Sequence, residues 1–278
     1  MHFTKLEATG NDFVLVDARE LESDWPRLAG EVCDRRHGVG ADGLLLLLRS
    51  GKADLRMRMF NPDGSEAEAC GNGLRCLVTY AAEAGLLNGA GAQVETLAGV
   101  RKTSITGDGS VEVGMGTPAF SPAEIPMVVD GSARDDPGPV VDYPVTVAGW
   151  TLLLGCLSMG NPHAVCFLES PVAHFPLPEV GPMIEHHPAF PNRANFEIVN
   201  FMGEGTPRCR VWERGAGETP SCGSGACAVA VMARLKGLAD SPVSVEMPGG
   251  TLTVRWDGAG EVFLGGPARL VFTGDWEG

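Results

Sequence analysis

The stretch "ACGNGLRC" at residues 69–76 returns later in the chain as "SCGSGACA" at residues 221–228. In both copies a cysteine precedes two small residues and an apolar segment of helical length, which indicates a helix start. Aligning the two cysteines brings further segments into register, 9–17 with 159–167 and 108–119 with 257–268. Three blocks in the same order and at nearly constant spacing indicate a duplicated unit.

Each copy of the repeat has the pattern of a mixed α/β unit. Strand-like runs lie at 13–16, 44–48, 55–60 and 111–115, with counterparts at 164–168, 197–201, 208–213 and 261–264. The two predicted helices, 74–84 and 226–236, end at Gly85 and Gly237, where a C′ glycine is expected. Because both segments are apolar on all sides, we expect each helix to be buried inside its own sheet.

The repeat also suggests the domain boundaries. A stretch rich in proline and aspartate, 121–144, lies between the two copies. We therefore expect an N-terminal lobe at 1–119 and a C-terminal lobe at 120–268. The last residues, 269–278, extend beyond the second copy and are expected to complete the sheet of the first lobe.

Composition excludes several classes of protein. The 278 residues are 44% hydrophobic, enough for a substantial core, and carry a formal net charge of −14 with a pI near 4.8. Such an acidic chain is a poor partner for nucleic acid. The longest purely apolar run, Leu44 to Leu48, is far too short for a membrane span, and the N-terminus lacks an apolar signal core. We expect a cytoplasmic protein that binds neither nucleic acid nor membrane.

Eight cysteines are too dilute in a chain of this length to form a disulfide scaffold, so most should be buried thiols. The two repeated motifs contain no CxxC pair, because Cys70 and Cys76 are separated by five residues and Cys222 and Cys227 by four. This spacing argues against a thioredoxin-type centre and weakens a zinc interpretation.

A cysteine at a helix start has a specific chemical meaning. The first turn of a helix carries unpaired N–H groups and partial positive charge, which acidify a thiol and attract an anion. If duplicated lobes bring the two helix starts to one cleft, a substrate carbon between the sulfurs meets a thiol on each face. One cysteine can then remove a proton as thiolate while the other delivers one as thiol, which inverts the stereocentre.

Six segments give the chain a resemblance to the diaminopimelate epimerase family. They cover nearly the whole sequence in family order: "TGNDFVLVDA" (9–18), "RHGVGADG" (36–43), "MFNPDGSEAEACGNGLRC" (59–76), "SMGNPHAV" (158–165), "NRANFE" (192–197) and "ERGAGETPSCGSGACA" (213–228). The resemblance implies an α/β (α+β) fold of two pseudo-symmetric lobes, each a mixed sheet or barrel wrapped around a central helix, with the active site in the cleft between them. It also implies a homodimer that uses neither pyridoxal phosphate nor a metal. The implied reaction interconverts LL- and meso-diaminopimelate, precursors of lysine and of cell wall.

The resemblance assigns roles to individual residues of this chain. Cys70 and Cys222 match the acid–base pair, and His163 and Glu213 match residues that adjust the thiol pKa values. The residues that match substrate-binding positions are Asn11, Asn61, Gly71, Asn72, Asn161, Asn195, Glu213, Arg214, Gly223 and Ser224. One departure is Gly43, which stands where many members carry a glutamine that touches substrate.

Other interpretations of these residues remain open. Asn61 could simply start its turn, Glu213 and Arg214 could form a surface ion pair, and His163 could be a core histidine. The segment from Arg35 to His37 is interpreted as a solvated turn. Alternative functions are racemisation of another amino acid such as proline or hydroxyproline, anion binding or redox sensing by facing thiols, and structural zinc binding.

Overall fold

The computed structural model describes residues 1–68, 70–129, 138–202 and 205–277. The chain forms two compact units, Met1–Gly114 with Gly265–Gly278, and Met115–Leu264. The units meet in the sequence at 114/115 and 264/265, a few residues before the boundaries at 119/120 and 268/269 that the repeat suggests. Part of the stretch at 121–144 expected between the lobes, residues 130–137, lies outside the described residues.

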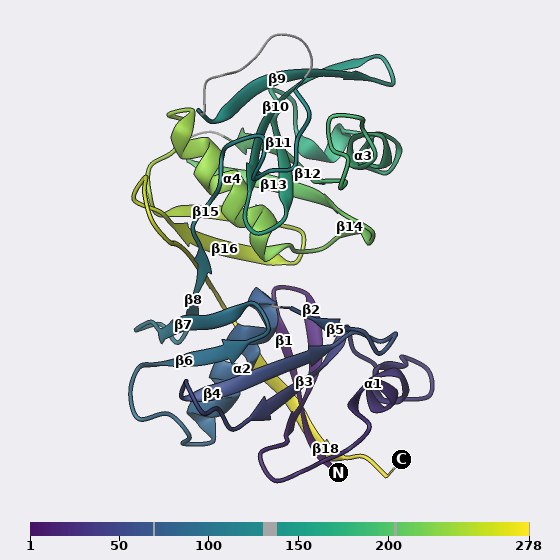
Figure 1. The fold of residues 1–278 in the computed structure, drawn as a ribbon, viewed down its shortest axis with the longest axis vertical. Coiled ribbons are helices and arrows are strands. Elements are labelled where there is room, and N and C mark those ends of the chain that lie inside the picture. The colour runs from purple at the N-terminus through teal and green to yellow at the C-terminus, as the bar shows by residue number, and fades with distance from the viewer. Residues whose placement is uncertain (69, 130–137, 203–204, 278) are drawn as a thin grey trace. The chain divides into compact units, whose positions relative to one another are not determined.

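The first unit contains two helices and a mixed sheet (Figure 1). Its helices are α1 (Trp25–Cys33) and α2 (Gly71–Glu83). Its strands are β1 (His2–Ala8), β2 (Asn11–Asp17), β3 (Gly43–Leu48), β4 (Leu55–Phe60), β5 (Glu66–Ala67), β6 (Gly91–Thr96), β7 (Gly99–Ile105), β8 (Val111–Gly116) and β18 (Arg269–Asp275). The chain passes into the second unit within β8, and the C-terminal strand β18 pairs with β1.

The second unit repeats this arrangement. Its helices are the short 3₁₀ helix η1 (Val172–His174), α3 (Leu177–Glu185) and α4 (Gly223–Leu235). Its strands are β9 (Val140–Val147), β10 (Trp150–Ser158), β11 (Pro162–Phe167), β12 (Asn195–Met202), β13 (Thr206–Glu213), β14 (Gly217–Thr219), β15 (Val243–Met247), β16 (Gly250–Arg255) and β17 (Val262–Gly266). All eight strands predicted from the repeat are confirmed, with ends that differ by up to two residues.

The sheets of the two units have the same pairing pattern. In the first, β18, β1 and β2 are antiparallel, β2 pairs parallel with β3, β3 is antiparallel to β4, and β4 pairs parallel with β6. In the second, β9, β10 and β11 are antiparallel, β11 pairs parallel with β12, β12 is antiparallel to β13, and β13 pairs parallel with β15. Registers agree as well: Phe13 opposes Gly43 on β2 and β3, and His163 opposes Asn195 on β11 and β12. Residues on these central strands therefore have structural counterparts in the other unit.

A long helix occupies the centre of each unit, as the sequence predicts. The helix α2 packs against β1, β2, β3, β4, β6 and β18, and α4 packs against β10, β11, β12, β13, β15 and β16. Every residue from Gly225 to Ala233 of α4 is buried. Both helices start directly after their cysteine, three residues earlier than predicted, and Gly85 and Gly237 follow them with the same φ of +67°.

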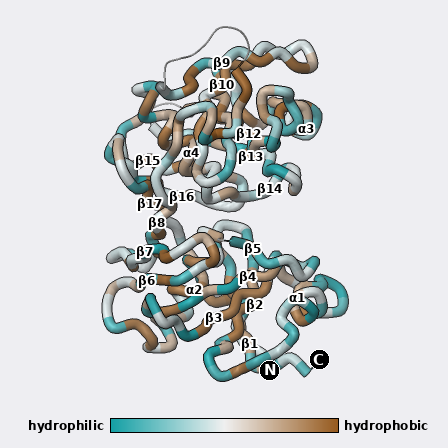
Figure 2. The backbone as a smooth tube through the Cα atoms, in the orientation of Figure 1, coloured by the Kyte–Doolittle hydropathy of each residue, from teal (hydrophilic) through white to brown (hydrophobic). Residues whose placement is uncertain are grey.

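The central strands bury both faces, which explains their continuous apolar sequences. In β3, Leu44 and Leu46 pack with α1 in one core cluster, whereas Leu45 lies against the first turn of α2. In β12, Phe196 and Ile198 similarly belong to the cluster formed with α3. Figure 2 shows β3 as a hydrophobic segment inside its unit. A polar side chain on the helix-facing side of such a strand is therefore enclosed by protein.

One close approach makes the packing of α3 testable. A Cβ added to Gly181 would lie 2.6 Å from Cδ2 of Trp212, whose indole is held by a 2.8 Å hydrogen bond from Nε1 to Glu185. We expect Gly181→Ala to lower the free energy of unfolding by about 1–3 kcal/mol through overpacking. Urea denaturation followed by tryptophan fluorescence measures this change. Gly51→Ala is the control, because the space around Gly51 is open, and equal midpoints for the two variants would contradict the packing argument.

Candidate active site

Each of the two cysteines caps its central helix. Cys70 precedes α2 in an extended conformation, and its Sγ accepts a hydrogen bond from the Gly73 N–H at 3.3 Å. Cys222 precedes α4 in the same conformation, and its Sγ accepts from the Gly225 N–H at 3.4 Å. Both sulfurs therefore lie at the positive end of a helix dipole, where a thiolate is stabilised.

The residues after each cysteine complete an anion-binding first turn. Gly71 and Asn72 are the first two residues of α2, and Gly223 and Ser224 are the first two of α4. N–H groups in this turn lack acceptors within the helix, so they can donate to a carboxylate. The sequence-predicted cysteine and carboxylate-binding positions thus come together within each unit.

The two thiols differ in their surroundings. Cys70 is half-buried, whereas Cys222 is buried with 5% of its surface exposed. Burial raises the pKa of the Cys222 thiol well above its usual value, and the carboxylates of Glu213 and Glu197 raise it further. The hydrogen bonds from Ser224 and the Gly225 N–H act in the opposite direction. In this structure the surroundings of Cys222 therefore favour the protonated thiol.

Asn11 and Asn72 bind each other beside the first thiol. The Asn72 amide donates to Asn11 Oδ1, and Asn11 Nδ2 donates to Asp42 Oδ2 at 3.1 Å. Asp42 in turn accepts from Arg35 at 2.7 Å. These bonds attach Asn11, at the start of β2, to the first turn of α2.

An ion-pair network surrounds Asp12, the residue that follows Asn11. Asp12 accepts from both Lys5 and Arg35 at 2.6 Å, and Lys5 is buried. The segment from Arg35 to His37 is the exposed turn that the sequence predicts, and Arg35 also joins Asp12 to Asp42. Its role depends on residues far away in the sequence.

Asn61 makes the hydrogen bonds of a turn residue. Its backbone N–H donates to the Ser65 carbonyl at 2.8 Å, and its Nδ2 donates to Ser65 Oγ at 2.9 Å. Near it, a Cβ on Gly43 would lie 3.0 Å from Met59 Cε and 3.1 Å from the Phe60 carbonyl oxygen. Position 43 is therefore tightly packed in this chain, and a glutamine there would require both neighbours to move.

In the second unit, His163 is held between two side chains. Its Nε2 lies 3.0 Å from Asn161 Oδ1, and its Nδ1 lies 2.7 Å from Glu197 Oε1. On the adjacent strand, Asn195 donates to the Pro162 carbonyl at 2.9 Å and accepts from the Arg214 N–H at 2.9 Å. The parallel pairing of β11 and β12 brings these residues together.

Glu213 and Arg214 have separate partners. Thr219 Oγ1 donates to Glu213, and Arg214 Nη1 donates to the Asn192 carbonyl at 3.2 Å. Neither bond joins Glu213 to Arg214. The Glu213 carboxylate raises the pKa of the Cys222 thiol through its negative charge.

Glu197 is a residue that the motif analysis missed as part of the site. It lies on β12 with no exposed surface, and its Oε1 is 2.9 Å from the position of a Cβ on Gly225. The signal in the sequence is weak: a single acidic residue inside the apolar run "ANFEIVNF" (194–201).

Comparison with known proteins identifies the family of this chain. The sequence model of the family described as diaminopimelate epimerase matches residues 3–121 and 155–271. A protein of Moorella thermoacetica named diaminopimelate epimerase is 49% identical over 282 residues, covering 99% of both chains. The chain belongs to the diaminopimelate epimerase family.

Solved structures show how widely the fold of this epimerase is shared. A phenazine biosynthesis protein of the PhzF family from Bacillus anthracis matches with a TM-score of 0.68 at 19% identity, covering 98% of this chain and 97% of its own. A hydroxyproline epimerase from Agrobacterium vitis matches with a TM-score of 0.67 at 16% identity, covering 99% and 91%. At these identities the likeness shows the fold alone.

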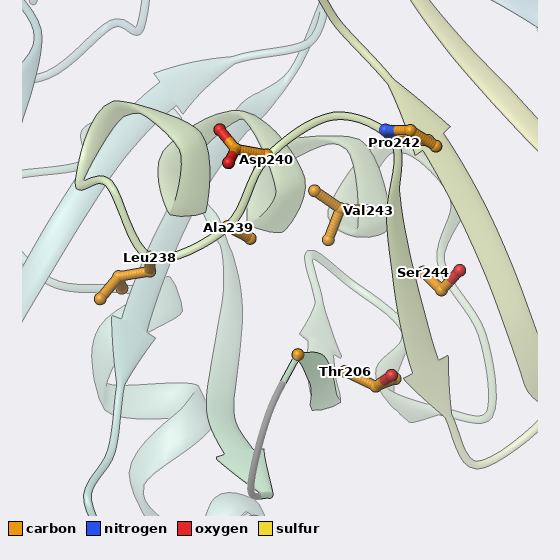
Figure 3. Close-up of a pocket in the computed structure, with 8 residues that line it drawn as sticks. Thr206, Leu238, Ala239, Asp240, Pro242, Val243 and Ser244 are labelled. Carbon is orange, nitrogen blue, oxygen red and sulfur yellow. The ribbon is translucent and has the colours of Figure 1, made fainter.

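A pocket in the second unit of the epimerase lies away from these residues. It is formed where the chain leaves α4 and enters β15, next to the start of β13 (Figure 3). Its lining residues are Gly205, Thr206, Leu238, Ala239, Asp240, Pro242, Val243 and Ser244. This lining contains no thiol and none of the candidate site residues. Within the described part of the chain, none of the helices combines the length and apolar character that a membrane span requires.

The network around Asp12 makes stability depend on pH. Burial opposes ionisation of Asp12, but hydrogen bonds and charges of Arg35 and Lys5 outweigh it and lower the Asp12 pKa to about 2. A depressed pKa contributes stability above the usual carboxyl pKa that is lost as pH falls toward 2. We expect Asp12→Asn to cost about 1 kcal/mol near neutral pH, a figure reduced by water screening, and progressively less as pH falls through about 2.

Urea denaturation of both proteins across this pH range measures the difference. Glu22→Gln, at an exposed position of the same unit, is the control and should leave stability unchanged throughout. A constant Asp12→Asn difference down to about pH 2 would contradict the ion-pair interpretation.

Proposed function

We propose that this epimerase interconverts LL- and meso-2,6-diaminopimelate by passing a proton across one α-carbon between Cys70 and Cys222. Family membership and the names of relatives that cover the whole chain support this substrate. The observation that carries the mechanism is the pair of equivalent, cysteine-capped helix starts.

The proposed step uses one thiolate and one thiol. The thiolate accepts the α-proton from one face, so the C–H bond breaks and an S–H bond forms. The opposite thiol gives its proton to the other face of the carbanion and becomes the new thiolate. The proposal requires the two sulfurs to flank one α-carbon, and in the reverse direction the two cysteines exchange roles.

The first turns of both helices would bind the carboxylate of the reacting carbon. N–H groups at Gly71, Asn72, Gly223 and Ser224 can donate to its oxygens. Negative charge moves onto these oxygens as the carbanion forms, so the donors and dipoles stabilise the transition state more than the bound substrate. This selective stabilisation would replace the electron sink that a cofactor supplies in other racemases.

The remaining candidates would bind the substrate's other charged groups. Arg214 can clamp a carboxylate with two parallel hydrogen bonds, and Glu213 can accept from an ammonium. The asparagines offer donors and acceptors without adding net charge, and they are Asn11, Asn61, Asn161 and Asn195. His163 and Glu213 would adjust the thiol pKa values. We further propose that the protein works as a cytoplasmic homodimer in the synthesis of lysine and cell-wall precursors.

The proton-transfer step predicts isotope exchange with solvent. During turnover of LL-diaminopimelate in D₂O, deuterium should enter the α-carbon of the product, because a thiol that has exchanged with solvent supplies the new hydrogen. Mass spectrometry of the product measures this incorporation. Full activity with retained protium would contradict the mechanism, and turnover of proline or hydroxyproline in preference to diaminopimelate would contradict the substrate.

Removal of either thiol should abolish epimerisation. We expect Cys70→Ala and Cys222→Ala each to lower kcat by at least about 10³-fold, since a two-base step needs both groups. Matched controls are Cys33→Ala in the first unit and Cys166→Ala in the second, because both residues are buried thiols elsewhere in the fold. An alanine variant at position 70 or 222 as active as its control would rule out the thiol pair.

A further inference from the structure

His163 and Glu197 form a buried pair in the second unit. Both side chains have no exposed surface, and Nδ1 of His163 lies 2.7 Å from Oε1 of Glu197. The other carboxylate oxygen, Oε2, is buried and has no hydrogen-bond partner among the residues that the structure describes. A carboxylate enclosed in this way is costly, because desolvation of an ion in a protein interior costs several kcal/mol.

The first unit shows that the fold does not need this pair. His163 occupies the position of Phe13, since each opposes the first residue of the paired strand, and Glu197 likewise occupies the position of Leu45. Two apolar residues, Phe13 and Leu45, thus occupy the equivalent positions in the first unit. The ionisable pair is therefore retained for a reason other than stability.

In both units, the side chain at this strand position (Leu45 or Glu197) lies next to the first turn of the central helix and its capping cysteine. A Cβ on Gly73 would lie 3.0 Å from Leu45 Cδ2 and 3.6 Å from Cys70 Sγ. The equivalent point on Gly225 lies 2.9 Å from Glu197 Oε1 and 3.4 Å from Cys222 Sγ. Where the first thiol has a leucine methyl group, the second has a carboxylate oxygen.

The hydrogen-bond partners of His163 determine where its protons lie and the net charge of the pair. Asn161 Oδ1 can only accept, so His163 Nε2 carries a hydrogen and donates to it. Nδ1 and Glu197 Oε1 then share one proton, and the pair is neutral as a whole whichever atom holds it. Without Glu197, nothing at Nδ1 would fix the ring and its proton.

We propose that Glu197 is a positioning residue that distinguishes the second thiol site from the first, by orienting His163 and by presenting a carboxylate to Cys222. The proposal rests on the proposed function only in assigning Cys222 to the reaction. Its consequence is that Cys222 holds its proton more firmly than it would beside an apolar residue, consistent with the direction in which Glu197 shifts its pKa.

The strands that pack against α4 carry other ionisable groups. Glu213 on β13 also faces Cys222, while Cys156 on β10 and Cys209 on β13 are buried thiols within the electrostatic reach of Glu197. On β15 and β16, Glu246 pairs with Arg208 and Arg255 lies over Phe263. Substitution at position 197 therefore leaves the other charge near Cys222, that of Glu213, in place.

Glu197→Gln tests the proposal because it replaces the carboxylate by an amide of nearly the same shape. In the substrate-free enzyme near pH 8, we expect Cys222 to react about tenfold faster with iodoacetamide, since the variant no longer places the carboxylate end of the His163–Glu197 pair beside the thiol. Peptide mass spectrometry follows Cys70 in the same sample, and its rate should stay within about twofold. Glu185→Gln is the matched control, because Glu185 is a buried carboxylate of the same unit that bonds Trp212 and Gly215; it should change neither rate.

Kinetics supply an independent readout. Glu197→Gln should lower kcat for diaminopimelate about tenfold in both directions with KM nearly unchanged, since a fully buried side chain does not touch substrate. An unchanged Cys222 rate in the folded variant, or an equal increase at Cys70, overturns the proposal. Failure of the wild type to epimerise diaminopimelate would refute the proposed function instead, and the alkylation rates would still decide the role of Glu197.

A second variant tests the premise that the pair is not structural. His163→Phe combined with Glu197→Leu copies the residues of the first unit into the second. We expect this protein to fold, with a circular dichroism spectrum like that of the wild type and an equal or higher unfolding midpoint. Loss of folding in this variant, or in Glu197→Gln, would show that the pair serves stability and would overturn the proposal.

Discussion

The hydrogen bond from a first-turn N–H to a cysteine sulfur, at the start of a helix enclosed by its own sheet, is the constraint on which the structure depends. The N–H groups in the first turn of such a helix have no acceptor within the helix and little access to water. The residue just before the helix must therefore supply a hydrogen-bond acceptor. Cysteine supplies one and leaves the other N–H groups for an anion. Because the acceptor in both units is a cysteine sulfur, each helix start combines a thiol with N–H groups that can bind a carboxylate.

The duplication explains why much of this fold could be predicted from one sequence. The strands and central helices repeat their apolar patterns, so each copy supports the interpretation of the other. The helices α1 and α3 carry no shared motif, and no helix was predicted in either place. They cover the second face of each sheet, a role that depends on tertiary packing rather than on a local pattern.

The contacts that surround the candidate site were harder to predict because they depend on strand register. Arg35 looks like part of a polar turn until folding places it between Asp12 and Asp42. Asn61 carries a motif position, yet its hydrogen bonds are those of the turn that it starts. Glu197 and His163 are separated by 34 residues, and only the parallel pairing of their strands brings them into contact. Motifs identify residue types at a site, whereas their partners come from the sheet.

The differences between the units are more informative than their likeness. Asn11 and Asn161 are equivalent, but Asn11 accepts from Asn72 of the central helix, whereas Asn161 accepts from His163, two residues further along the chain on β11. The hydrogen-bond donor to the asparagine is therefore a helix residue in the first unit and a strand residue, His163 in place of Phe13, in the second. This change also brings the imidazole against Glu197, where the first unit has leucine. Because an apolar pair fills the equivalent position of the first unit, the fold itself gives no reason for the polar pair, which lies beside the second thiol. Such an asymmetry would set which of the two thiols holds the proton in the substrate-free enzyme.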